Sequence, residues 1–130
     1  EFPEVTIAEI YRVLKPEGVF VAKTPNKHHY MPVVARLTPL WFHKFYNRLR
    51  GRQSIDTFPT FYRCNTRSDV NKYATKIGFR EANLEYWEGR PEYLRIFTVT
   101  YVLGLLYERI VNMSKALASF RCVLVFELKK

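Results

Sequence analysis

The chain has 130 residues, of which 48% are hydrophobic, 16% aromatic and 25% charged. A disordered tail or a low-complexity linker is poorer in apolar side chains, so we expect one folded domain. The longest uncharged apolar run, residues 96–107, is shorter than the roughly 20 residues that span a bilayer. No basic region precedes an apolar segment near Glu1, and we therefore expect a soluble, cytoplasmic protein.

The positive charge is concentrated in one part of the chain. The formal net charge is +9, and residues 27–67 hold eight cationic side chains against a single acid, Asp56. Such a segment attracts phosphate, nucleic acid or an anionic membrane surface. The simpler alternative is a solvated face whose charges serve only solubility. The cationic residues are Lys27, Arg36, Lys44, Arg48, Arg50, Arg52, Arg63 and Arg67.

The first third of the chain predicts a helix, a turn and a strand. Residues 5–14 place apolar side chains at helical spacing, and Pro16 and Gly18 end that helix. Residues 19–24 form a continuous apolar run, which is typical of a strand buried on both faces. The apolar stripe of the helix consists of Ile7, Ile10, Tyr11 and Leu14.

The basic segment predicts two short helices and a loop. The first covers residues 31–37, and Thr38 and Pro39 are suited to cap and begin the second. Apolar residues then repeat at helical spacing until Gly51, which suits the position after a helix. Residues 52–65 show no periodicity and predict an aromatic-rich loop. The repeating apolar residues of the second helix are Phe42, Phe45, Tyr46 and Leu49.

The second half of the chain predicts alternating helices and strands. Thr66 and Asp69 have the spacing of a capping box for a helix that ends at Gly78. Alternating apolar residues predict a strand over 79–86, and a long apolar segment predicts a helix from Pro91 to about Asn112. The run 120–128 predicts a strand that is apolar on both faces and therefore central in a sheet.

Residues 9–21 read EIYRVLKPEGVFV and closely resemble the E-x-x-R-V-L-K-P-G-G stretch of class I S-adenosylmethionine-dependent methyltransferases. In that family the stretch is the helix and turn before the fifth strand of a seven-stranded Rossmann-like sheet. Thr24, Pro25 and Asn26 follow, as at the end of this strand in many members. Glu17 stands where the family prefers glycine, while Gly18 is kept.

The resemblance implies an α/β fold with a partial Rossmann-like sheet. Its strands would correspond to strands five, seven and six of the family's sheet, in that spatial order. The last strand of the chain would be antiparallel to the other two. Residues 1–130 would form the C-terminal portion of the methyltransferase domain, and residues 27–65 a basic, aromatic-rich, substrate-facing insertion. Family members bind the cofactor through a glycine-rich loop and an acidic strand end. Neither is recognisable here, so we expect no cofactor-binding residue in this segment. S-adenosylmethionine would be bound by a missing N-terminal half.

The resemblance also implies which residues face the methyl acceptor. Ligands of open parallel sheets collect at the carboxyl ends of strands, which is where Thr24 and Asn26 lie. His28 and His29 are candidate catalytic residues because imidazole is the natural base near neutral pH. Tyr30 adjoins them and is a further candidate for acceptor binding.

Three residues of the insertion complete the expected site. Asp56, the only acid in the basic segment, either orients a histidine or pairs with Arg63, and Tyr62 belongs to an aromatic cluster that forms either an apolar pocket or core. Cys64 and Cys122 make neither a disulfide framework nor a CxxC pair, so we expect reduced thiols and no metal site. The remaining members of the cluster are Trp41, Phe42, Phe45, Phe58 and Phe61.

Two functions are compatible with these patterns. In the first, the chain is the acceptor-binding part of a methyltransferase that acts on a small-molecule or lipid-linked acceptor. Its fifth-strand edge would then need the missing half or another chain as a partner, and the apolar helix from Pro91 would pack on the sheet or contact a lipid. In the second, the chain is a non-enzymatic basic module that binds nucleic acid or an anionic membrane. The sequence contains no recognisable nucleic-acid-binding motif, which favours the first.

Overall fold

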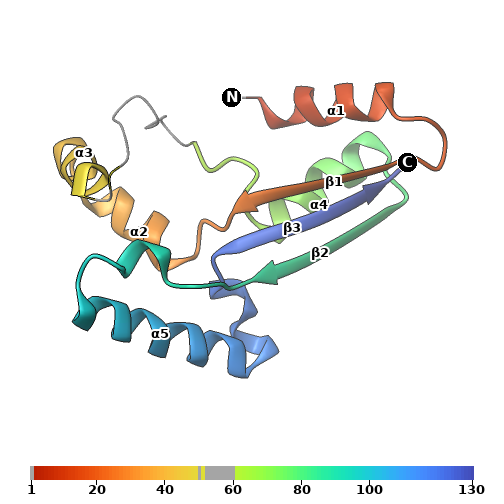
Figure 1. Cartoon of the computed structure of the whole chain (residues 1–130). Helices are drawn as coiled ribbons and strands as arrows, with labels where there is room; N and C mark the ends of the chain where they lie inside the picture. The colour runs from red at the N-terminus through yellow and green to blue at the C-terminus, as the bar shows by residue number, and fades with distance from the viewer. Residues whose placement is uncertain (1, 50, 52–60) are drawn as a thin grey trace.

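The computed structural model describes residues 2–49, 51 and 61–130, and within these ranges the chain forms a mixed α/β structure with a three-stranded sheet (Figure 1). No described helix is long and apolar enough to cross a membrane. In chain order the elements are α1 (Pro3–Val13), β1 (Val19–Pro25), α2 (Tyr30–Leu37), α3 (Leu40–Leu49), α4 (Arg67–Ile77), β2 (Glu81–Trp87), the 3₁₀ helix η2 (Glu92–Leu94), α5 (Thr98–Met113), the 3₁₀ helix η3 (Lys115–Phe120) and β3 (Val123–Lys129).

The last strand lies in the middle of the sheet. The strand order is β1-β3-β2, and β3 pairs antiparallel with both neighbours, so β1 and β2 run parallel to each other. This is the order that the resemblance implied for these three strands. Val123 pairs with Pro25 on one side and Trp87 on the other, so β1 and β2 end at the same level.

One face of the sheet carries the core. Figure 1 shows α1 and α4 together on one side of the strands, and their buried side chains pack on alternate residues of the sheet. The opposite face is open: Val21 and Trp87 are 61% and 60% exposed. The core residues are Ile7, Val70, Ala74, Phe79, Leu84, Leu124, Phe126 and Leu128.

The expectation that residues 19–24 are buried on both faces is therefore wrong for β1 in this chain. The apolar run is continuous, but only one layer of described helices covers the sheet, and every second residue of β1 is exposed. β1 is also an outer strand, and within the described ranges its second edge pairs with no strand. A continuous apolar run shows that both faces of a strand can be buried. Whether both are buried depends on the helices that cover the sheet.

The last two predicted elements also differ from the structure. Pro91 is followed by the 3₁₀ turn η2, so α5 begins only at Thr98, and Phe120 belongs to η3 rather than to the final strand. α5 packs against η2 and η3 instead of covering the sheet. α5 lies close to the segment before it at Gly104: a Cβ at this position would be only 2.5 Å from Cβ of Pro91.

Capping residues fix α4 and separate α2 from α3. The Thr66 hydroxyl accepts from the Asp69 backbone amide at 3.1 Å, and Asp69 accepts from the Asn65 amide and from the Thr66 hydroxyl rather than from the Thr66 amide. Gly78 ends α4 with φ of 102°. The Thr38 hydroxyl donates back to the Val34 carbonyl at 2.9 Å, so it bonds to the end of α2.

The turn before β1 depends on Gly18. Its amide donates to the Lys15 carbonyl at 2.9 Å, and Glu17 adopts a left-handed φ of 62°. Glycine would be less strained at position 17, but the Glu17 carboxylate pairs with Arg80 and with Lys129. Glu17 therefore links the turn to the ends of β2 and β3.

We expect Gly18→Ala to destabilise the chain by about 1–3 kcal/mol, because the added Cβ would lie 2.7 Å from the Lys15 carbonyl oxygen. Urea denaturation followed by circular dichroism measures the loss. Glu17→Gly is the matched control: it removes backbone strain and two ion pairs together, so its midpoint should move much less. A Gly18→Ala midpoint equal to that of the parent would contradict this account of the turn.

Candidate functional site

The carboxyl ends of β1 and β2 meet at one end of the sheet, beside the start of β3. β1 leads into the segment Asn26–Tyr30, β2 leads into Glu88, and Cys122 directly precedes β3. In Figure 1 this is the end from which α2 and α5 extend. Four of the residues expected from the sequence, Asn26, His28, His29 and Tyr30, lie in this one short segment.

Asn26 is fully buried and holds the strands together. Its side-chain amide donates to the carbonyls of Ser119 and Arg121 at 2.6 and 2.7 Å, while its side-chain oxygen accepts from the His28 amide at 3.1 Å. Its backbone amide donates to the Cys122 carbonyl at 2.8 Å. Because these polar atoms are engaged within the protein, Asn26 is a structural residue rather than an acceptor-binding one.

A second buried asparagine, Asn65, joins the end of the insertion to the end of β1. The Asn65 side-chain amide donates to the Thr24 hydroxyl at 2.6 Å and to the Pro25 carbonyl at 2.7 Å. The Asn65 carbonyl accepts from the Lys27 amide at 3.3 Å. Residues 27–65 therefore leave the sheet and return to it at the same place.

His29 forms a buried pair with Glu88. The imidazole is 2% exposed, and Nε2 lies 3.6 Å from a Glu88 carboxylate oxygen without a hydrogen bond of its own. Nδ1 accepts from the Met31 amide at 3.4 Å, which assigns the ring proton to Nε2, facing Glu88. Burial lowers the pKa of His29 to about 4 and raises the pKa of Glu88, so each is shifted toward its neutral form.

Aromatic rings and a thiol enclose this pair. The Tyr30 ring lies 4.0 Å from the His29 ring and 5.0 Å from the Tyr107 ring, centroid to centroid. The Tyr107 hydroxyl donates to the Phe120 carbonyl at 2.6 Å. Burial raises the pKa of Tyr30, that of Tyr107 to about 12 and that of Cys122 to about 11. At neutral pH these three groups are therefore protonated.

His29, Glu88 and Cys122 also have the chemistry of metal ligands. In the part of the chain that the structure describes, they form one group of three whose ligand atoms lie within 4.8 Å of one another. Zinc requires a thiolate and an imidazole nitrogen without a proton. Here the bond from Met31 places the ring proton on Nε2. The hydrogen bonds favour an imidazole–carboxylate pair over metal ligation through Nε2.

The remaining predicted residues line a separate groove. It has a volume of about 450 Å³ and lies between α1, β1 and residues 61–65. Its lining includes Thr24, Tyr62 and Arg63 together with apolar side chains of α1 and β1. The side chain of Lys23 alternates with that of Thr24 and therefore lies on the open face of the sheet with Val21. Tyr62 has a left-handed φ of 49°, and the Arg36 guanidinium lies 5.2 Å from its ring centroid. The groove combines apolar walls with the guanidinium of Arg63, which suits an anion with an apolar body.

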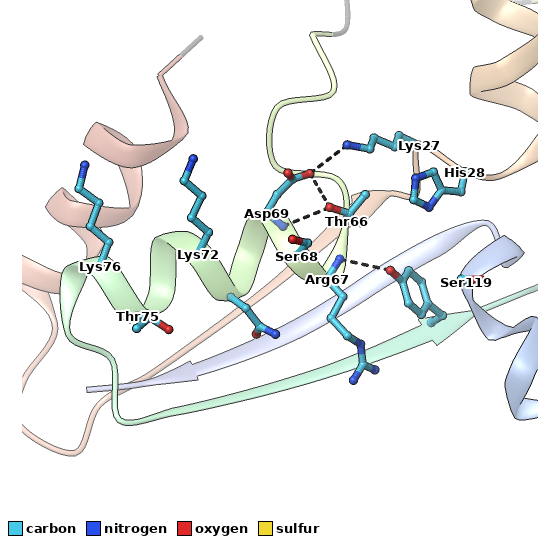
Figure 2. Close-up of a pocket in the computed structure, with 12 residues that line it drawn as sticks. Lys27, His28, Thr66, Arg67, Ser68, Asp69, Lys72, Thr75, Lys76 and Ser119 are labelled. Carbon is cyan, nitrogen blue, oxygen red and sulfur yellow. Dashed lines mark hydrogen bonds and ion pairs between the residues drawn. The ribbon is translucent and has the colours of Figure 1, made fainter.

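A third hollow surrounds the start of α4 and is basic (Figure 2). It is open, with a volume of about 1100 Å³, and includes the exposed His28. Three of its cations have partners: Lys27 lies 3.5 Å from Asp69, Lys76 lies 2.7 Å from Glu4, and a guanidinium nitrogen of Arg67 donates to a carbonyl of β2. Lys72 also lines the hollow. The contacts of the other three reduce its capacity to hold a free anion.

The sequence expectations thus divide among three places. His29, Tyr30 and Asn26 belong to the buried cluster, Thr24, Tyr62 and Arg63 to the groove, and His28 to the basic surface, while Asp56 lies outside the described residues. The sequence analysis missed Glu88, Tyr107 and Asn65 as members of the site. Glu88 had a usable signal, because an acid directly after a predicted strand lies at the same sheet edge as the end of the first strand.

No known protein family matches this chain, and no curated protein matches it.

We expect Asn26→Asp to destabilise the chain by about 3 kcal/mol or more, because a buried carboxylate would face two carbonyl oxygens in place of an amide that donates to both. Urea denaturation measures the effect. Asn71→Asp, at an exposed position of α4, is the matched control and should change the midpoint little. Equal midpoints for the two variants would contradict the structural role of Asn26.

The low pKa of His29 makes stability depend on pH. The folded chain resists protonation until about pH 4, whereas an unfolded histidine takes up its proton near 6.5, so stability falls as the pH drops between these values. One buried histidine with this shift accounts for on the order of 3 kcal/mol. Glu88 acts in the opposite direction, because its raised pKa lets the folded state hold a proton first.

We therefore expect His29→Asn to flatten the decline of stability from pH 6.5 to 4. Asparagine does not titrate, and its side-chain oxygen can replace Nδ1 as the cap of α2. Urea midpoints measured across this range test the expectation, with circular dichroism at neutral pH as the check that α2 is retained. Parallel pH profiles for the parent and the variant would refute it.

Proposed function

We propose that this chain is the acceptor-binding, C-terminal part of an S-adenosylmethionine-dependent methyltransferase. The observation that carries the proposal is the order of the sheet. A helix and the Lys15-Pro16-Glu17-Gly18 turn lead into β1, and the last strand then lies antiparallel between β1 and β2. The resemblance of residues 9–21 implies this arrangement of strands.

The free side of β1 supports the same proposal. β1 is an outer strand whose second edge has no strand partner in the described ranges. Apolar residues of α1 and β1 line the groove beside it. Exposed strand edges invite pairing, and a parallel strand supplied by preceding polypeptide would satisfy this edge and cover the α1 side of the groove. The part of the groove lined by Thr24, Tyr62 and Arg63 would remain for the acceptor.

We expect the residues of this chain to contribute no cofactor site of their own. The glycine-rich loop of a Rossmann-like fold brings backbone amides to the ligand, whereas the five glycines here stand far apart: Gly18, Gly51, Gly78, Gly89 and Gly104. When bound elsewhere in the complete enzyme, S-adenosylmethionine would supply an activated methyl group. This chain would contribute the alignment of the acceptor and the exclusion of water.

The environments of the two histidines suggest different roles. His29 is enclosed and carries its proton on Nε2, toward Glu88, so it shapes the end of β1 rather than accepting a proton. His28 is exposed but lines the basic hollow along α4 and not the groove, so it would act as the base only on an acceptor that reaches that hollow. Arg63 at the groove favours an acceptor with a phosphate or carboxylate.

The test is calorimetry with S-adenosylmethionine on two proteins, this chain alone and the chain extended by about 100 preceding residues, the length that a Rossmann-type half requires. We expect binding by the extended form alone. Hydrogen exchange should show new protection of β1 in that form, while the outer edge of β2 serves as the internal control. Tight binding by the short form, or no binding by the extended form, would overturn the proposal.

A further inference from the structure

The surface of α3 exposes large apolar and cationic side chains together. Trp41, Lys44, Phe45, Arg48 and Leu49 are all exposed. Their spacing of three and four residues places them on one side of the helix, and we call this side the α3 face. The pattern of Phe42, Phe45, Tyr46 and Leu49 had predicted one buried stripe, but the structure divides it between two sides.

The adjacent side of α3 explains this division. Phe42 and Tyr46 are half-buried and stack with ring centroids 6.1 Å apart. The Phe42 ring also contacts the Trp41 ring, with centroids 6.0 Å apart, so a half-buried aromatic side borders the exposed side with apolar and cationic residues. Figure 1 shows α3 standing away from the sheet, at the far end of α2, so the strands do not cover the α3 face.

α2 also exposes apolar side chains. Leu37 is 80% exposed, and Val33 and Val34 are also exposed, as is the cationic Arg36. Residues 27–49 contain no aspartate or glutamate. Exposed apolar side chains and cations therefore occur together on this pair of short helices, whose own sequence holds no acid.

We propose that the α3 face docks on an anionic lipid bilayer, with Trp41, Phe45 and Leu49 at the level of the headgroups and Lys44 and Arg48 beside the lipid phosphates. Short helices with Trp, Phe or Leu on one flank and Lys or Arg on the other bind in this way, parallel to the membrane plane. The proposal goes beyond methyl transfer and needs no cofactor, so either can fail without the other.

Charge distinguishes this occupant from the alternatives. A second copy of the chain would bring a like-charged surface to the α3 face, since the net charge is +9, and repulsion would oppose that contact. Duplex DNA would match the cations but would leave the aliphatic side chains in water, because phosphate contacts dominate its binding. An anionic bilayer satisfies the cationic and the apolar side chains together.

A second exposed apolar stripe, on α5, lacks this complementarity. It includes Val102, Leu106 and Ile110, but the charged residues of α5 are one acid and one base, Glu108 and Arg109. Nothing in its charge selects a bilayer over any other apolar partner. The stripe therefore provides a matched control for the α3 face.

The two tryptophans of the chain allow the contact to be located. Trp41 lies on the α3 face and is 67% exposed, while Trp87 lies on the open sheet face and is 60% exposed. In Trp87→Phe the only indole is that of Trp41, and in Trp41→Phe it is that of Trp87. With vesicles of phosphatidylcholine and phosphatidylglycerol, we expect the emission of Trp41 to shift to the blue and resist quenching by acrylamide, and that of Trp87 to stay unchanged.

Vesicle flotation with variants that introduce a negative charge measures the contribution of each surface. Phe45→Glu and Leu106→Glu change side chains that are 56% and 55% exposed. We expect the first to weaken binding roughly tenfold and the second to leave it unchanged. Pure phosphatidylcholine vesicles should bind less well by about fivefold for each cation at the surface, and added salt should weaken binding to the anionic vesicles.

Three results would overturn the proposal. The first is no binding to anionic vesicles by a chain whose circular dichroism shows it folded. The second is equal loss in Phe45→Glu and Leu106→Glu, or a blue shift of Trp87 without one of Trp41. The third is binding to duplex DNA, measured by fluorescence anisotropy, that persists in Phe45→Glu while vesicles do not bind, which would assign the basic helices to nucleic acid.

Discussion

The hydrogen bonds of one buried side chain join the end of β1 to the start of β3. Asn26 follows β1, and its amide donates to two carbonyls in the segment that enters β3, far away in the sequence. If the amide lost these partners, the cost of removing it from water would no longer be offset by hydrogen bonds. These bonds hold the start of β3 beside the end of β1, where the antiparallel pairing of the two strands begins. β3 pairs with β2 along its other edge.

The same constraint explains why the most reactive residue types are the least accessible. Joining the ends of β1 and β2 to the start of β3 brings an imidazole, a carboxylate and a thiol into a small volume lined by Tyr30 and Tyr107. Burial shifts the pKa of each toward its neutral form, and a neutral cluster is far less costly to enclose than a charged one. We therefore interpret the cluster as a structural contact between the ends of β1 and β2 and the start of β3. We propose the groove instead for acceptor binding, because Arg63 adds a cation to its apolar walls.

Local patterns in the sequence predicted local structure well. The cap at Thr66, the stop at Gly78 and the helix over residues 5–14 depend on neighbours within one turn, and the structure contains all three. The spacing of apolar residues did not reveal which part of the protein, or solvent, the apolar side of each helix would contact. Phe45 and Leu49 fit a buried stripe and are exposed, and α5 fits a sheet-covering helix and packs elsewhere. Burial is decided by tertiary neighbours, and the neighbour of Glu88 is His29, which precedes the basic insertion, α4 and β2 in the sequence.

The placement of the basic insertion connects the two proposals. Its ends meet where Asn65 accepts from the Lys27 amide and donates to the Pro25 carbonyl, so the excursion begins and ends at the carboxyl end of β1. A surface contact made by α3 would therefore act on an insertion whose two ends are fixed to the sheet by buried hydrogen bonds. Because α3 stands away from the sheet (Figure 1), the α3 face and the groove are separate surfaces of the chain. Binding to a bilayer and alignment of a methyl acceptor would therefore be two separate tasks, connected only through the fixed ends of the insertion.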